Sequence, residues 1–275
     1  MMKVLILTCL LLLSGAARAA EPVLKIDIGG EKRELTREAM LAMPEAATIE
    51  VVRDMTYHGP MTYRAVPVAA LLAGLTFPPD SVLEAVAMDG FVAQLPLDLV
   101  LNTDPSKAVA WIAIEPEGKP WPKIPYKDGT PGPFYLVWTG AEVGKIRMEQ
   151  WPYQTAKLVS QPSPASRWPE LAVDVSLPST DPVRAGQALF VVQCLPCHKM
   201  NGAGASDLGP DLNRPMNPTE YMTPDGLHAL IRDPKSVRTW PEQKMQGWPP
   251  DLLSDREIDL IIAYLKHMAG LKVAP

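Results

Sequence analysis

The sequence predicts a multidomain protein in which an α+β region with a mixed sheet precedes an all-α region. Three observations predict this arrangement. Residues 21–160 contain short apolar and β-branched runs separated by turn residues, a pattern typical of strands mixed with short helices. Residues 180–275 instead place apolar residues at helical spacing. Residues 161–179 are rich in proline and serine, so we predict a semi-rigid linker between two domains.

The first nineteen residues have the layout of an export signal. Lys3 precedes an apolar run from Val4 to Leu13, and small residues around Ala19 follow. This order matches the charged, apolar and cleavage regions of a secretory signal peptide. The run is too short for an ordinary membrane span. We predict that residues 1–19 are removed on export to a bacterial periplasm, with no stable membrane insertion afterwards. An uncleaved signal that anchors the chain is the alternative.

The net negative charge of the chain argues against some classes of binding partner. Without Lys3 and Arg18 the formal net charge changes from −5 to −7. An acidic chain repels nucleic acid and anionic membrane surfaces, and it favours a basic protein partner. Of the three cysteines, Cys9 lies in the predicted signal and is lost with it. The exported chain therefore keeps two cysteines.

The elements of the first domain follow from local patterns. Thr36 is a helix N-cap, and Asp89-Gly90 is typical of a tight hairpin turn. The predicted helices cover residues 36–43 and 66–75. The predicted strands cover residues 23–28, 48–53, 81–88, 91–95, 108–114, 133–138 and 145–153.

The helices of the second domain are marked by their caps. Asp181 followed by Pro182 predicts the start of a helix. Ser254 and Glu257 form a capping box, which predicts a second helix from that point. Apolar residues on one face of this last helix recur at helical spacing, namely Ile258, Ile261, Ile262 and Leu265.

Between these helices lies a Cys-x-x-Cys-His sequence formed by Cys194, Cys197 and His198. This motif is typical of covalent attachment of a c-type haem. Two thiols about one helical turn apart reach the same porphyrin edge, and the adjacent histidine reaches the iron. We therefore predict one haem c per chain. A redox dithiol or half of a zinc site is the alternative interpretation.

The whole stretch from 180 to 270 resembles a class I cytochrome c. Gly186 and Phe190 match the close-packing positions of the first helix of that family, and Tyr264 matches the aromatic residue of its last helix. Residues 209–212 match the loop that follows the haem motif. The resemblance implies that the last helix crosses the first at Gly186.

The same resemblance implies a ligand set for the iron. The Pro210 carbonyl would accept a hydrogen bond from the ring nitrogen of His198 that does not bind iron. The sixth ligand would be Met245, in the loop before the last helix, with Met222 as second candidate. His/Met ligation leaves no open coordination position and favours electron transfer. His228 and His267 are the bis-histidine alternatives, and the other methionines after the motif are Met200, Met216 and Met268.

Residues 21–159 resemble, in a reduced form, the molybdopterin-binding domain of the sulfite oxidase superfamily. The matching stretches are residues 63–72, 89–91 and 131–137. The resemblance implies molybdenum bound by a cysteine thiolate that precedes the first of these stretches. That place is occupied by residues 51–60, which contain no cysteine.

No cysteine occurs anywhere between Cys9 and Cys194, and Phe134-Tyr135 stand where the family has an arginine. We therefore expect no molybdopterin chemistry. The domain is expected to keep the fold and to dock a partner or bind a small ligand.

Residues 51–64 offer one further candidate site. Met55, His58 and Met61 are soft ligands close together in sequence, which suits copper(I). Arg53 and Arg64 flank them and could hold a small anion. The alternative interpretation is two packing methionines, a loop histidine and ordinary surface charges.

Three functional hypotheses remain. The first is a periplasmic electron-transfer protein that exchanges electrons with a redox protein partner. The second is an oxidoreductase of the dehydrogenase type, whose first domain oxidises a small substrate and passes electrons to the haem. The third is a copper-handling or sensor protein.

Overall fold

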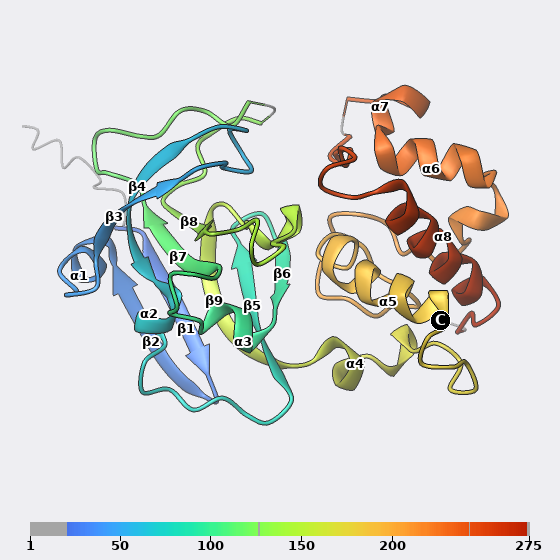
Figure 1. Cartoon of the computed structure of the whole chain (residues 1–275), viewed down its shortest axis with the longest axis horizontal. Coiled ribbons are helices and arrows are strands. Elements are labelled where there is room, and N and C mark those ends of the chain that lie inside the picture. The colour runs from blue at the N-terminus through green and yellow to red at the C-terminus, as the bar shows by residue number, and fades with distance from the viewer. Residues whose placement is uncertain (1–20, 126, 242, 274–275) are drawn as a thin grey trace, which may run out of the picture.

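A computed structural model describes residues 21–125, 127–241 and 243–273. The predicted signal peptide lies outside the described residues. Two regions lie side by side, with the strands on the left and the helices α5 to α8 on the right (Figure 1). This confirms the predicted arrangement of a region with a mixed sheet followed by a helical region.

The first sheet of the N-terminal region has five strands in the order β2-β1-β9-β5-β6. This sheet is mixed. Strands β1 and β9 run parallel, and all the other neighbouring strands pair antiparallel. The register pairs Ile26 with Leu158, and both side chains are buried. The strands are β1 (Val23–Ile28), β2 (Glu31–Thr36), β5 (Ser81–Ala87), β6 (Val92–Leu95) and β9 (Thr155–Pro162).

The remaining strands form a second sheet, which the sequence did not predict. The second sheet is antiparallel throughout, in the order β3-β4-β7-β8. Strands such as β1 and β4 bury alternate residues, and the buried faces of both sheets contribute to one core. The strands are β3 (Ala47–Val51), β4 (Met61–Pro67), β7 (Val109–Ile114) and β8 (Phe134–Thr139).

The helices of this region are short. Thr36 caps α1 (Arg37–Leu41) by accepting a hydrogen bond from the Ala39 N–H at 3.1 Å. The helix expected over residues 66–75 is reduced to α2 (Val68–Leu71), because β4 pairs with β3 and β7 and continues to Pro67. A third helix, α3, covers Leu97–Val100.

The strand expected over residues 145–153 is absent from the described residues. A 3-10 helix, η1 (Met148–Gln150), occupies this place. Lys145 and Gln154 have φ values of 51°, and the proline at 152 lacks an N–H, so the backbone cannot stay extended and paired. Strand β9 begins only at Thr155.

Strand β2 was not predicted from sequence. Its six residues are mostly polar and none is buried, as suits an edge strand that shows no apolar alternation. Gly29 and Gly30, with φ of 60° and 88°, make the turn that folds β2 back onto β1. The two glycines therefore mark the turn in the sequence, whereas the residues of β2 have no strand pattern of their own.

The segment between the two regions is ordered. Strand β9 includes residues 161 and 162, and α4 (Pro164–Arg167) and η2 (Pro169–Leu171) follow. Arg167 pairs with Glu84 of β5 at 2.8 Å. Leu171 and Val173 are instead buried in the core of the helical region. The segment therefore contacts the sheet region through Arg167 and the helical region through Leu171 and Val173.

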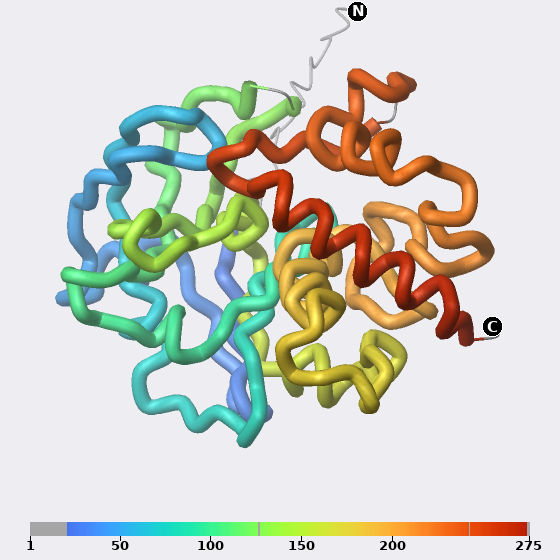
Figure 2. The backbone as a smooth tube through the Cα atoms, turned by 45° about the vertical axis from the view of Figure 1, so that its right-hand side comes forward, coloured from blue at the N-terminus to red at the C-terminus, as the bar shows by residue number. Residues whose placement is uncertain are grey.

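The helical region is organised by two crossing helices, α5 (Pro182–Gln193) and α8 (Asp255–Ala269) (Figure 2). The Asp181 side chain caps α5, and Ser254 and Glu257 form the expected capping box of α8. The other elements are η3 (Pro218–Glu220), α6 (Pro224–Arg232) and α7 (Pro234–Val237). Of the helices described, none has both the length and the apolarity needed to cross a membrane.

Candidate functional site

The two cysteines lie in a tight turn that continues α5. The N–H groups of Cys197 and His198 both donate to the Cys194 carbonyl, at 3.1 and 2.8 Å. Both cysteines are free thiols. Burial raises the pKa of the Cys194 thiol to about 12, and the nearby Glu149 carboxylate adds to the effect. The Cys197 pKa is raised for the same reasons.

Raised thiol pKa values bear on the alternatives to haem. A reactive dithiol needs a thiolate, which forms at lowered pKa. Among the residues that the structure describes, no group of three or more His, Cys, Asp or Glu side chains could hold a metal ion. Two protonated thiols one turn apart fit covalent attachment to one porphyrin edge.

His198 is held by the loop that follows it. Its Nδ1 lies 2.9 Å from the Pro210 carbonyl oxygen. Because a carbonyl only accepts, Nδ1 carries the proton, and Nε2 keeps its lone pair. Burial lowers the pKa of His198, against the effect of the Pro210 bond. A neutral imidazole with a free Nε2 is the form that binds a metal ion.

Gly209 explains how the loop comes so close to the imidazole. A Cβ built at Gly209 would lie 2.5 Å from the Cε1 atom of His198. Any side chain at this position would push the ring or the loop away, and the bond to Pro210 would be lost. The glycine therefore helps to set the orientation of the ring.

The frame behind this turn is the crossing of α5 and α8. A Cβ built at Gly186 would lie 2.0 Å from the Leu260 carbonyl oxygen. Four residues later, the Phe190 ring packs against the Tyr264 ring with centroids 5.1 Å apart. The Tyr264 hydroxyl donates to the Leu171 carbonyl at 2.9 Å. The helix that carries Cys194 is thus fixed to the last helix.

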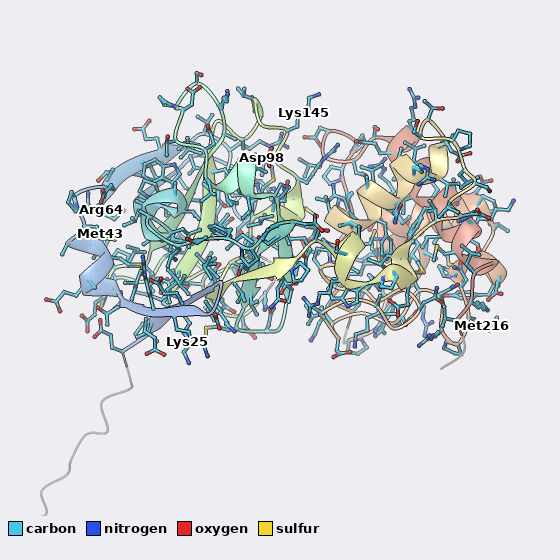
Figure 3. The ribbon with its side chains drawn as sticks, turned by 90° about the horizontal axis from the view of Figure 1, so that it is seen from below. Lys25, Met43, Arg64, Asp98, Lys145 and Met216 are labelled. Carbon is cyan, nitrogen blue, oxygen red and sulfur yellow. The ribbon has the colours of Figure 1, made fainter. Side chains whose placement is uncertain are left out.

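The candidate sixth ligands occupy different environments. Met245 and Met222 are half-buried and pack against the core of the helical region. Met200 and Met268 are buried within that core. Met216 is 50 % exposed, and it lies at the outer end of the helical region, away from the sheets (Figure 3).

The two histidine alternatives have other contacts. His228 Nε2 lies 3.5 Å from the Asp255 carboxylate. His267 Nε2 accepts the Asp174 N–H at 3.1 Å. A ring nitrogen that already accepts a hydrogen bond is not available to a metal ion. The geometry therefore favours the methionines over His267.

Two buried polar side chains of the helical region lack hydrogen-bond partners among the described residues. Gln193, which precedes Cys194, is 2 % exposed, and neither side-chain polar atom has a hydrogen-bond partner. Trp248, three residues after Met245, is 7 % exposed with a partnerless Nε1. Buried polar atoms are normally paired, so these atoms are available to hydrogen-bond a bound group or water. Together with the cysteine turn, these residues fit a haem.

The candidate residues of the N-terminal region differ in burial and in contacts. Met55 and Met61 pack against the sheet core, and His58 is exposed. Arg53 pairs with Asp251 of the helical region at 2.5 Å. Arg64 lies at the outer edge of the sheets, far from the helical region (Figure 3). The two arginines therefore do not face a shared anion.

Sequence reasoning missed Asp54, which is fully buried between these residues. Its carboxylate accepts the Tyr63 hydroxyl at 2.9 Å and the N–H groups of Thr56 and Tyr57 at 2.8 and 3.0 Å. Burial raises the Asp54 pKa, and these bonds oppose the rise. Tyr135 of β8 lies on the other side, 3.5 Å from the carboxylate. The bonds to Thr56 and Tyr57 are local, but no sequence pattern marks the two tyrosines, which come from the separate strands β4 and β8.

The two regions meet beside the cysteine turn. The Val92 N–H of β6 points to the Pro196 carbonyl at 3.4 Å. Glu149 of η1 is half-buried there, and burial raises its pKa to about 8. Arg147 pairs with Glu257 of α8 at 2.5 Å. The sheet region therefore covers one side of the candidate haem site.

Comparisons with known proteins agree with the helical region. The family model described as cytochrome c oxidase, cbb3-type, subunit III, matches residues 181–265. The C-terminal region is thus a cytochrome c domain, which implies haem c, electron transfer and redox partners. A comparison with curated proteins found no match.

Among solved structures, the chain is similar to the sulfane dehydrogenase SoxCD from Paracoccus pantotrophus. The identity is 19 %, and the alignment covers 50 % of this chain and 38 % of that chain. The TM-score of 0.36 is too low to support an argument about the N-terminal region.

Proposed function

We propose that this chain is an exported electron-transfer protein whose C-terminal domain carries one haem c with His198 and Met245 as axial ligands. The observation that carries the proposal is the bond between His198 Nδ1 and the Pro210 carbonyl, 2.9 Å long, beside the cysteine turn. It leaves Nε2 as the ring atom that can bind iron. The family match over residues 181–265 supports the same conclusion.

Each residue has a distinct task in this proposal. Cys194 and Cys197 would form the two thioether bonds, and His198 and Met245 would hold the iron. When bound, haem supplies a one-electron centre whose two strong axial ligands leave no position for a substrate. The buried Phe190 accepts the N–H groups of Cys194 and Leu195 through its carbonyl, at 2.9 Å each, and keeps the turn in place.

The assignment of Met245 is tested by substitution in holoprotein matured in a periplasm. We expect Met245→Ala to abolish the weak sulfur-to-iron absorption band of the ferric state and to lower the reduction potential. Met222→Ala is the matched control, because Met222 is also half-buried on the same core. A band that survives Met245→Ala and disappears in Met222→Ala would transfer the assignment to Met222.

The N-terminal region is proposed to dock a redox partner rather than to catalyse. Its strands lie against the turn that holds the cysteines, through the contact of Val92 with Pro196. The stretch in which a molybdenum-binding cysteine would be expected instead holds Asp54, whose oxygens are bonded to Tyr63, Thr56 and Tyr57. The formal net charge is −5 for the full sequence and −7 without residues 1–19, and this favours a basic partner.

Elemental analysis of the exported protein separates this proposal from its rivals. We expect one iron per chain without stoichiometric molybdenum or copper. Stoichiometric molybdenum would favour a dehydrogenase that feeds electrons to the haem. Stoichiometric copper that is lost in His58→Ala would favour copper handling. Mass spectrometry of the same sample locates the cleavage site, which we place after residue 19 or 20.

A further inference from the structure

The loop that contains Met245 is irregular, and it is held from two sides. The Met245 loop is defined as residues 245–254, which precede α8. On one side lies Arg232 of α6, whose guanidinium donates to the carbonyls of Trp248 and Leu253, the latter at 2.8 Å. A Cβ built at Gly247 would lie 2.3 Å from the Arg232 carbonyl oxygen, so the loop backbone rests directly on α6.

On the other side the Met245 loop touches the sheet region. Arg147 donates to the Leu252 carbonyl at 3.1 Å and to the Glu257 carboxylate at 2.5 Å. Arg53 donates to the Asp251 carboxylate at 2.5 Å. Figure 2 shows the segment that leads into α8 reaching across to the blue strands of the N-terminal region. On the loop, the two contacts fall at adjacent residues, Asp251 and Leu252.

The Arg147 contact is the stronger of the two on physical grounds. The side chains of Arg147 and Glu257 are 28 % and 23 % exposed, whereas those of Arg53 and Asp251 are 44 % and 51 % exposed. Water and salt screen the exposed pair more. Arg147 is also bidentate across the loop and α8, and its own N–H donates to Gln150 Oε1 at 2.8 Å.

We propose that Arg147, assisted by Arg53, is a positioning residue through which the N-terminal region holds the Met245 loop against the haem. The inference rests on the proposed ligand role of Met245. The thioether is a neutral ligand on a loop without regular structure, so its occupancy of the iron depends on how firmly the loop is held. The sheet region thereby sets the stability of the iron–sulfur bond in its neighbour.

The test measures competition for the sixth position. Added imidazole replaces the thioether only when the loop moves away, so its apparent affinity reports the population of the released loop. In ferric holoprotein we expect Arg147→Met to raise this affinity by about fivefold to tenfold, since it removes two charge-assisted bonds. Arg53→Met should raise it by about twofold.

Arg167→Met is the matched control. Arg167 also forms an ion pair, with Glu84 at 2.8 Å, and its partner belongs to β5 rather than to the Met245 loop. We expect its imidazole affinity to equal that of the original protein. Arg147→Lys keeps the charge but loses the two-point contact, so its affinity should lie between those of the original protein and Arg147→Met.

The outcomes separate the two proposals. If Arg147→Met and Arg167→Met bind imidazole equally well, the positioning role is overturned, even when Met245→Ala shows that Met245 is the ligand. If the sulfur band persists in Met245→Ala, the ligand assignment has failed and this inference fails with it. Circular dichroism and unfolding of Arg147→Met exclude loss of the fold as the cause.

Discussion

The two regions differ in the hydrogen bonding of one titratable side chain, Asp54 in the sheet region and His198 in the helical region. Asp54 of the sheet region is bonded through both oxygens to Tyr63, Thr56 and Tyr57, so its network is closed. His198 of the helical region uses only Nδ1, through the bond to Pro210, and keeps Nε2 free for a metal ion. A closed network stabilises a fold, whereas an open one prepares a site. The free Nε2 of His198 therefore places the candidate haem site in the helical region.

The largest expected effect comes from removing the thiols on the open side. We expect the double substitution Cys194→Ala and Cys197→Ala to abolish covalent haem, because no other cysteine of the exported chain can form a thioether bond. Haem staining of denatured protein measures this. His58→Ala in the sheet region should retain full haem content. Equal haem in both variants would remove the distinction between the regions.

The next effect concerns the closed network. Asp54→Ala leaves the Tyr63 hydroxyl and two backbone N–H groups without an acceptor, at a cost of about 3 kcal/mol in the free energy of unfolding of the sheet region. Denaturant unfolding followed by tryptophan fluorescence measures the loss. Asp98→Ala, at an exposed position, is the control. A haem spectrum that changes in Asp54→Ala would show that the network also serves the redox site.

A smaller effect is expected at the helix crossing. Gly186→Ala forces a Cβ to within 2.0 Å of the Leu260 carbonyl, so α5 and α8 must separate. We expect a loss of about 2 kcal/mol in the free energy of unfolding of the helical region. Gly270→Ala, where the nearest atom would be 3.4 Å away, should be tolerated. Thermal unfolding monitored through the haem absorbance distinguishes the two variants.

The smallest effect lies at the contact between the regions. Burial raises the pKa of Glu149 from 4.5 to about 8, so the folded state keeps its proton while the unfolded chain loses it. Stability is therefore greatest below pH 4.5 as far as this group is concerned, and it falls as the pH rises from 4.5 to 8. Glu149→Gln should remove this loss and add about 1 kcal/mol at pH 8, since partial exposure weakens the effect.

Denaturant unfolding at several pH values measures the Glu149 effect. Glu142→Gln makes the same chemical change at an exposed position and serves as the control. If both variants keep the pH dependence of the original protein, Glu149 is exposed to water in solution and the two regions do not bury it.

Local sequence was sufficient for much of the helical region. The caps at Asp181 and Ser254 involve residues two or three positions apart, and each was predicted and is found. The sheet region was less predictable. Strand β2 has no apolar alternation, and β4 replaces part of an expected helix because pairing with β3 and β7 outweighs local preference.

By itself the sequence determined the two-region organisation, the Cys-x-x-Cys-His turn and the helices on either side of it, because their signals are short-range. Only the tertiary structure decided that Asp54 meets Tyr135, and that Arg53 meets Asp251, 198 residues further along the chain. Such pairs depend on how strands and regions pack, and a single charged residue in a loop carries no periodic pattern that points to its partner. The same reason applies to Arg147 and Glu257, whose ion pair connects the sheet region to α8.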